Sequence, residues 1–192
     1  MGFGLPATAA WRLLDAHVGF EVLFPRREPD GWRIEGHSTG VEEGEAWGIR
    51  YTVALDEMWV TRSAHIVGRS ALGAHEVQLE GDGAGGWRVD GRPSPQLDGC
   101  LDVDLEASAC TNAFPVNRLG LEVGQRAEAP AAHVRALDLR VERLEQSYAR
   151  LPHDGGPARY DYASAGFDFR AELVYDEFGL VLDYPGIAVR VL

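Results

Sequence analysis

The chain has 192 residues, 45% hydrophobic and 25% charged, so it can bury one core, and we expect a single domain over residues 1–192. Its net charge of −12 argues against nucleic acid and anionic membrane surfaces as partners, because their phosphate groups would repel it. All 18 basic residues are Arg, which excludes a Walker A loop and a Schiff-base lysine, since both need Lys.

Alternation of apolar and polar residues, typical of half-buried strands, dominates the first half of the chain. In residues 48–55 (GIRYTVAL), for example, the apolar side chains at 49, 51, 53 and 55 share one face. The same pattern predicts strands at 32–36, 58–68, 75–81 and 85–91. Between the last two, GDGAGG at 81–86 suits the positive φ angles of a turn, so we expect a hairpin there.

GHSTG at 36–40 matches the G-x-S-x-G pattern of a nucleophile elbow. That elbow needs a strand before it and a helix after it, but the following residues lead into another strand pattern. With 23 Gly in the chain, chance is a serious explanation of the match. We interpret the segment as a loop and predict that Ser38 is not a nucleophile.

Residues 100–105 (CLDVDL) form a strand pattern with acids on one face. Asp102 and Asp104 are two positions apart, which places them ~7 Å apart on that face. Such a pair can act in general acid–base chemistry if burial separates its pKa values, or it can contribute to a binding site. The same face can equally well meet solvent.

Helix is scarce, and we expect the principal helix within residues 108–120. Ser108, Thr111 or Asn112 can be its N-cap, and Gly120 can end it in the left-handed conformation. Pro115 must then lie in the first turn, where its missing N–H is not needed.

We expect Asp102, Asn112 and Arg118 to meet near one point, because only about six residues separate the acidic strand from the helix. Arg118 can neutralise an acid or hold a ligand oxygen with two hydrogen bonds. We favour a structural Asp102–Arg118 pair and a ligand contact for Asn112.

The rest of the chain returns to strand patterns. Residues 144–151 could form a helical turn, but they continue the alternation, so we interpret them as a strand. The other predicted strands and their apolar faces are 134–144 (Leu137, Leu139, Val141), 167–175 and 180–184 with a turn at 176–179, and 185–192 (Ile187, Val189, Val191). No repeating strand–helix alternation is present, which disfavours an α/β fold.

These elements predict an all-β, mainly antiparallel domain whose long, many-stranded sheet is bent or rolled around little helix. Long antiparallel sheets curl or close because open edges are a liability. A curled sheet that its own side chains do not fill encloses a cavity, which is the usual way in which such folds bind apolar ligands.

Cysteine and histidine give no sign of a metal or cofactor. Cys100 and Cys110 fit neither a zinc pattern nor a redox pair, and the six histidines are scattered. With these two cysteines a reducing compartment is the default interpretation, and the N-terminal stretch has no signal-peptide features, so we expect a cytoplasmic protein. No apolar run approaches ~18 residues, so we expect no membrane span.

Several segments occur in an order that resembles a known family: YTVALDEMWVTR (51–62), GGWRVDG (85–91), GCLDVDLEASACTNAFPVNRL (99–119), LEQSYAR (144–150) and GLVLDYPGIAVRV (179–191). Together they resemble the bacterial putative glycolipid-binding family, formerly a domain of unknown function. The resemblance implies a spiral β-roll, a long sheet wound around a single central helix, with TNAFPVNRL as that helix. It implies no catalytic residues.

Three functions of different classes remain open. The first, which we favour, is non-enzymatic binding of a glycolipid or similar amphipathic small molecule, with a polar mouth drawn from Trp59, Arg62, Asp102, Asp104, Thr111, Asn112 and Arg118. The second is a hydrolase acting on a sugar or ester, with Asp102 and Asp104 together in a cleft. The third is a structural module without a ligand, whose sheet edge forms a homodimer.

Overall fold

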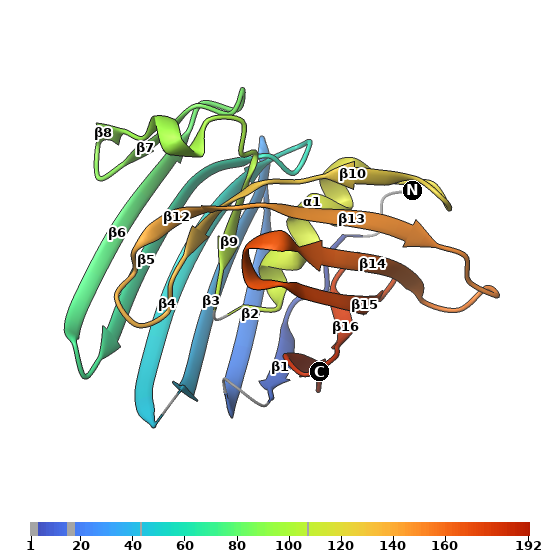
Figure 1. Ribbon diagram of the computed structural model, residues 1–192, viewed down its shortest axis with the longest axis horizontal. Helices are drawn as coiled ribbons and strands as arrows, with labels where there is room; N and C mark the ends of the chain where they lie inside the picture. Colours follow the sequence, from blue (N-terminus) through green and yellow to red (C-terminus); the bar gives the residue numbers. More distant parts are fainter. Residues whose placement is uncertain (1–3, 15–17, 43, 107) are drawn as a thin grey trace.

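The computed structural model describes residues 4–14, 18–42, 44–106 and 108–192. Within these ranges the chain forms two β-sheets, of 14 and three strands, and one α-helix (Figure 1). Short 3-10 turns lie at η2 (Pro95–Leu97), η3 (Cys110–Asn112) and η4 (Ala165–Phe167). The predicted all-β class is confirmed.

The large sheet is antiparallel between all its neighbouring strands. Its spatial order is β10 (Arg126–Glu128), β13 (Gln146–Leu151), β14 (Ala158–Ser164), β15 (Phe169–Tyr175), β16 (Val181–Tyr184), β17 (Ala188–Arg190), β1 (Ala9–Leu13), β2 (Val18–Glu28), β3 (Gly31–Glu42), β4 (Glu45–Asp56), β5 (Thr61–Ser70), β6 (Gly73–Gly81), β7 (Trp87–Val89) and β8 (Arg92–Pro93). The small sheet has the order β12 (Val141–Leu144), β11 (Ala131–Val134) and β9 (Asp102–Leu105), and β9 and β11 run parallel.

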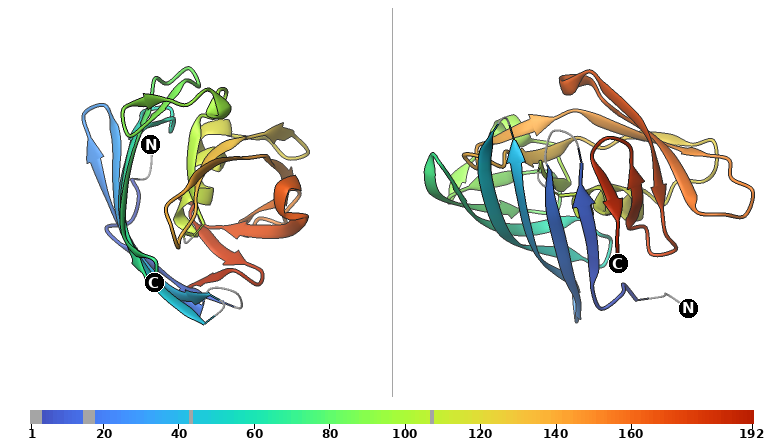
Figure 2. Two further views of the ribbon diagram at one scale, coloured as in Figure 1. Left: turned by 60° about the vertical axis from the view of Figure 1, so that its left-hand side comes forward. Right: turned by 90° about the horizontal axis from the view of Figure 1, so that it is seen from below.

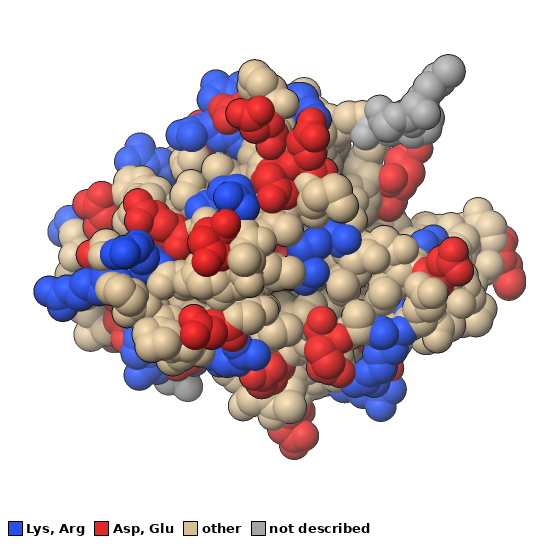
Figure 3. Space-filling model, turned by 90° about the horizontal axis from the view of Figure 1, so that it is seen from above, with Lys and Arg blue, Asp and Glu red and all other residues tan. Residues whose placement is uncertain are grey.

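The large sheet is rolled around the helix, as the resemblance implied. Figure 2 shows the first strands, in blue and green, facing the last strands, in orange and red, with the helix between them. The helix, α1 (Ala113–Leu119), follows η3 directly, and Phe114 is completely buried. On the face drawn in Figure 3, acidic and basic side chains alternate over the surface, an ordinary solvated pattern despite the net charge of −12.

The first and last strands lie side by side near the middle of the large sheet. Trp11 of β1 pairs with Arg190 of β17, whose guanidinium carbon lies 5.0 Å from the centre of the indole ring. The indole nitrogen of Trp11 donates a hydrogen bond to the carbonyl of Val181, 170 residues away along the chain, at 2.7 Å. These contacts join the two halves of the sheet.

The predicted strands of the first half are confirmed where one face is buried. Ile49, Tyr51, Val53 and Leu55 of β4 are each at most 5% exposed. The predicted hairpin is also present, with β6 and β7 joined by residues 82–86, where an Asp82 carboxylate oxygen accepts hydrogen bonds from the backbone of Ala84 and Gly86.

The helix lies where the sequence predicts it and ends at Gly120, whose φ of 53° is in the left-handed region. The hydroxyl of Ser108 accepts a hydrogen bond from the backbone N–H of Thr111 at 3.3 Å, as a capping group does. Asn112 occupies the N-cap position of α1, one of the three positions predicted, but its side chain makes no capping hydrogen bond there. Its side chain is instead held by a tyrosine, described below.

The prediction of one strand over 134–144 is wrong. Residues 135–140 form the connection of a β11–β12 hairpin, in which Leu139 has a φ of 56° and is 5% exposed. A methyl group of Leu139 lies over Gly68 of β5, and the Ser70 hydroxyl donates to the carbonyl of Leu137 at 2.9 Å. The apolar residues of this connection therefore pack on the large sheet instead of continuing a strand.

The predicted face of the last strand is also wrong. Ala188 of β17 is completely buried, whereas Val191 is 52% exposed. Arg190, not a valine, lies on the same face as Ala188, with its guanidinium carbon 5.0 Å from the centre of the Trp11 ring.

GHSTG lies within β3 and not in a loop, so that interpretation is corrected. A Cβ at Gly36 would lie 2.2 Å from the ring of Tyr51, and one at Gly40 would lie 2.5 Å from the ring of Trp47. Both glycines thus make room for aromatic rings of the neighbouring strand β4. Ser38 between them is completely buried in the middle of a strand, which agrees with the prediction that it is not a nucleophile.

Candidate ligand-binding site

Asp102 and Arg118 form a buried ion pair that ties the helix to β9. Arg118 donates from Nε to Oδ1 at 3.0 Å and from Nη2 to Oδ2 at 2.6 Å, so both carboxylate oxygens are engaged. The Asp102 side chain is 1% exposed, and burial raises its pKa while the contact with Arg118 opposes that shift. The predicted contact is confirmed, and for Asp102 the interpretation of a solvent-facing acid is wrong.

Asp104, two residues further on, has different partners. One carboxylate oxygen accepts from the Thr111 hydroxyl at 3.0 Å, and the other accepts from Nδ1 of His133 at 2.7 Å. His133 is the residue of β11 directly opposite Asp104 in the parallel β9–β11 pair. Burial disfavours a charge on His133, but the carboxylates of Asp104 and Glu106 outweigh burial and raise its pKa above the usual 6.5.

Asn112, where the 3-10 turn meets the helix, lies close to this group. Its Oδ1 accepts a hydrogen bond from the hydroxyl of Tyr148 at 2.9 Å, and the residue is 5% exposed. Because Tyr148 engages the oxygen, the amide nitrogen is the part of the side chain left to face other groups.

A partly enclosed cavity of about 210 Å³ lies beside these side chains. One wall is apolar, and the aromatic rings of Tyr162, Phe169 and Tyr184 in it pack at centroid distances of 5.8 to 6.2 Å. The full lining is Asp104, Leu105, Glu106, Ser108, Asn112, His133, Leu144, Tyr162, Ser164, Phe167, Phe169, Tyr184 and Ile187. We call this space the aromatic cavity.

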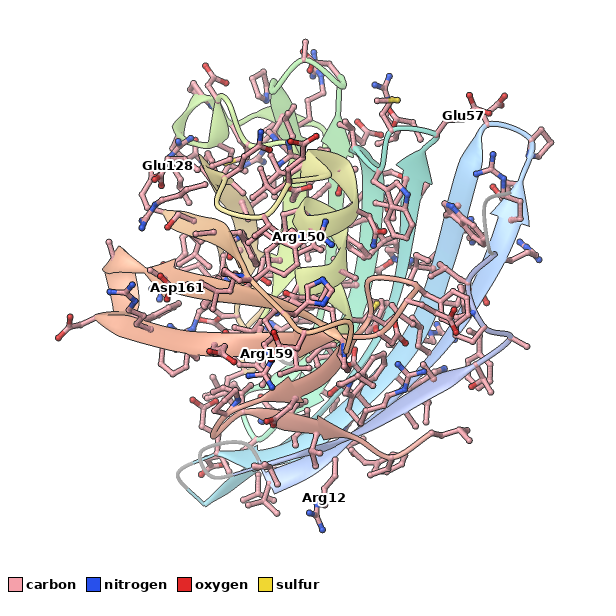
Figure 4. The ribbon with its side chains drawn as sticks, turned by 90° about the vertical axis from the view of Figure 1, so that its right-hand side faces the viewer. Arg12, Glu57, Glu128, Arg150, Arg159 and Asp161 are labelled. Atoms are coloured by element: carbon pink, nitrogen blue, oxygen red, sulfur yellow. The ribbon has the colours of Figure 1, made fainter. Side chains whose placement is uncertain are left out.

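Strand β14 supplies part of the apolar wall. Tyr160 and Tyr162 face the interior and are at most 4% exposed. Arg159 and Asp161, drawn in Figure 4, alternate with them and form ion pairs with Glu172 and Arg170 of β15 on the other face. Alternation along one strand thus separates the cavity wall from a charged outer surface.

Two polar atoms of the lining residues have no hydrogen-bond partner among the residues that the structure describes. They are Nε2 of His133 and Oγ of Ser164, on residues that are 3% and 1% exposed. Burial raises the pKa of Tyr162, and the side chain of Ser164 is near enough to oppose that rise, but no hydrogen bond of good geometry joins the two. A buried polar group without a partner costs ~1–3 kcal/mol, so such atoms are uncommon in folded proteins. Their position beside a cavity indicates a place where a ligand atom could complete the hydrogen bonding.

A sequence model of the family described as "Putative glycolipid-binding" matches residues 8–190 of the chain. The chain belongs to this family. The family membership expected from the sequence is therefore confirmed, and the match covers the strands and the helix that form the aromatic cavity.

Two solved structures are similar to this member of the family. A DUF1089 family protein from Pseudomonas aeruginosa is 36% identical, with a TM-score of 0.78 over 89% of this chain and 92% of that one. A beta-barrel-like protein of domain of unknown function DUF1849 from Brucella abortus is 10% identical, with a TM-score of 0.50 over 96% of this chain and 92% of that one, which shows the fold alone. No curated protein matches this chain.

The candidate site residues taken from the sequence do not all meet in this family member. Asp104 and Asn112 line the aromatic cavity, and Thr111 holds Asp104 in place. Asp102 and Arg118 are not among the lining residues, so the two acids do not face a common cleft as the hydrolase hypothesis requires.

Trp59 and Arg62 lie elsewhere, Trp59 in the β4–β5 connection and Arg62 at the start of β5. Trp59 has a φ of 65°, and its ring centroid is 6.2 Å from that of Trp32. Arg62 is 3.8 Å from the Asp56 carboxylate. Their role in ligand binding stays a prediction.

Sequence reasoning missed two titratable residues, His133 and Glu21. Glu21 of β2 is completely buried, and one of its oxygens accepts from the hydroxyls of Tyr51 and Ser108, each at 2.5 Å. The other accepts from the backbone of Ala109 at 2.7 Å. Burial raises the pKa of Glu21 to about 7, against the opposing effect of these hydrogen bonds.

A sequence signal for Glu21 existed, because an acid stands in β2 on the same face as the buried Leu23. In the part of the chain that the structure describes, no group of three His, Cys, Asp or Glu side chains could hold a metal ion. Among the same residues, no helix has the length and hydrophobicity needed to cross a membrane.

Proposed function

We propose that this protein is a non-enzymatic binding protein for an amphipathic ligand of the glycolipid type, held in the aromatic cavity. The observation that carries the proposal is the lining of that cavity, where aromatic and aliphatic side chains form one wall and Asp104, Asn112, His133 and Ser164 contribute polar groups. Binding pockets for small molecules commonly combine an apolar lining with a few polar groups that fix orientation.

The volume of the cavity limits what it can hold. About 210 Å³ is below the ~300–1,000 Å³ of most small-molecule pockets, so the cavity suits one part of an amphipathic molecule. A polar groove of about 300 Å³ adjoins it, because Ser164 and Phe169 line both spaces. The remainder of the ligand would extend along this groove, where Arg126 and Arg170 alternate with acidic residues.

Two further parts of the proposal concern partners and location. A homodimer through a sheet edge is consistent with the short edge strands β8 and β10, each of which has a neighbour on one side only in the large sheet. A cytoplasmic location is supported by Cys100 and Cys110, which are both buried free thiols. Light scattering and cell fractionation test these two parts separately.

The experiment that tests the function is native mass spectrometry of freshly purified protein, followed by lipid extraction. We expect a bound lipid carrying a polar head, and we expect Ile187→Trp, which fills the cavity from its half-buried rim, to lose it. Val189→Trp, two residues further on in β17 and outside the lining, is the control and should keep the lipid. Lipid retained by Ile187→Trp would contradict binding in this cavity.

A ligand-free structural module is the alternative that one observation favours. Phe114 of the helix and Tyr148 and Tyr175 of the sheet are completely buried, so much of the roll is filled by its own side chains. That module predicts no bound lipid in wild-type protein and no effect of Ile187→Trp beyond stability.

A further inference from the structure

We propose that the aromatic cavity selects an uncharged oxygen group of its ligand, a hydroxyl or a carbonyl, through Nε2 of His133 and Oγ of Ser164. The inference rests on the proposed function and deepens it by naming the chemistry that the site recognises. It starts from the two atoms that lack a hydrogen-bond partner among the described residues, both of which belong to residues lining the cavity.

The orientation of the His133 ring is fixed by a hydrogen bond on its Nδ1 side. Its Nδ1 faces the carboxylate of Asp104 at 2.7 Å, and Asp104 is held in turn by the Thr111 hydroxyl at 3.0 Å. Because a carboxylate accepts hydrogen bonds, Nδ1 carries a proton whether the ring is charged or neutral. Nε2 is therefore the nitrogen available to a ligand: it donates when the ring is charged and accepts when the ring is neutral.

The charges around His133 disfavour an anionic ligand. Asp104 and Glu106 both line the cavity, and Glu142 lies opposite His133 in the β11–β12 pair. Arg135 faces this group from the end of β11, but it is engaged with Glu106 at 3.1 Å and lies 3.8 Å from Glu142. A phosphate or carboxylate would lose its water at high cost and be repelled by these carboxylates, whereas an uncharged oxygen loses water at lower cost and is not repelled.

Phe167 covers the approach to His133. Its ring meets the imidazole edge-on, with the centroids 5.5 Å apart, and the residue is 48% exposed. Both unpartnered atoms are themselves buried, so a side chain of the lining has to move before a ligand reaches them, and we infer that for His133 this side chain is Phe167. Since nearly half of Phe167 already faces solvent, its displacement uncovers little additional apolar surface.

The two kinds of uncharged oxygen respond differently to pH. A carbonyl only accepts, so its hydrogen bond to Nε2 is lost as pH rises through the raised pKa of His133. A hydroxyl can instead donate to the neutral Nε2, so its binding persists. The pH dependence thus distinguishes an ester carbonyl of an acyl chain from a hydroxyl of a sugar.

The test uses delipidated full-length protein with n-octyl β-glucoside, methyl octanoate and n-octyl phosphate as probes, by calorimetry at pH 6 and pH 9. We expect at least one uncharged probe to bind at pH 6 more tightly than octyl phosphate. If it is the glucoside, affinity should persist at pH 9, and if it is the ester, affinity should fall.

Variants separate the roles of the ring nitrogens. His133→Asn retains a donor near the Nδ1 position, so we expect binding about tenfold weaker, whereas His133→Gln retains one near Nε2 and should bind better than His133→Asn. Ser164→Ala should also weaken binding, and Ser94→Ala, a buried serine outside the cavity, should not. As a readout on the wild-type protein, the imidazole ¹⁵N shift of Nε2 in His133 should change on adding the bound probe.

Tighter binding of octyl phosphate than of both uncharged probes would overturn the inference. So would equal affinity in wild type, His133→Asn and Ser164→Ala with an unchanged ¹⁵N shift, although the proposed function would stand because the probes still bind. If no octyl compound binds, the proposed function itself fails and the inference fails with it.

Discussion

Glu21 is a carboxyl group buried completely inside the roll, and the free energy of unfolding should depend on pH through it. Its pKa is raised from 4.5 to about 7 in the folded state, so the stability it contributes is fully present below pH 4.5 and is lost as pH rises through 7. A shift of this size corresponds to ~3 kcal/mol. His133 acts in the same direction, because its pKa is also raised.

Urea denaturation at pH 5 and pH 8.5 measures this effect. The loss of unfolding free energy between the two pH values should be smaller in Glu21→Gln than in wild type, because the amide does not titrate. An identical loss in both proteins would show that Glu21 is not the group responsible.

Arg118 is the second residue with a clear energetic role. Arg118→Ala leaves the buried Asp102 carboxylate without its partner and should cost ~3–5 kcal/mol of unfolding free energy. Arg159→Ala, which breaks an exposed ion pair with Glu172, is the control and should cost no more than ~1 kcal/mol. A loss of lipid with little loss of stability in Arg118→Ala would instead assign this arginine to ligand binding.

At the scale of single elements, the two glycines of GHSTG have a packing role that can be measured. A Cβ at Gly36 would clash with the ring of Tyr51 at 2.2 Å, so Gly36→Ala should cost ~1–3 kcal/mol. Gly48→Ala on β4 is the matched control, because its Cβ would make an ordinary contact of 3.7 Å with Thr39. Denaturation curves that place Gly36→Ala level with Gly48→Ala would contradict this role.

The sequence predicted the strands with one buried face, because alternation records the difference between interior and solvent. It predicted less for β9, which lies inside the roll with Asp102 and Val103 both completely buried. There the acids are stabilised by Arg118 and His133, and alternation carries no information on such partners. The prediction of a continuous strand through 135–140 was wrong for a related reason, because Leu139 packs against Gly68 of a distant strand.

The candidate site was predictable only in part. Asp104 and Asn112 both line the cavity. Their proximity was predictable because only a short connection joins the acidic strand to the helix. His133 joins them through a parallel strand pairing 29 residues away in sequence, and Ser164 and Phe169 come from the far side of the roll. Contacts between such distant segments depend on how the sheet curls, which local pattern does not specify.

At the scale of the whole molecule, the large sheet and the helix share one core, and we predict that the chain unfolds as one domain. Thermal or urea unfolding should give a single transition, with coincident midpoints by far-UV and near-UV circular dichroism. Far-UV spectra should also show much less than ~30% helix, the ordinary share in globular proteins. Two resolved transitions would contradict a single domain.

The pairing of β1 with β17 has a consequence for synthesis on the ribosome. β1 is made before the other strands of the large sheet, yet its partner on one side is made only about 175 residues later. Until β17 is made, one edge of β1 has no partner strand, and the Trp11 indole lacks its hydrogen-bond acceptor, the carbonyl of Val181. The nascent chain therefore exposes an aggregation-prone strand edge until β17 is made. We expect chaperones to be needed most before β1 and β17 pair.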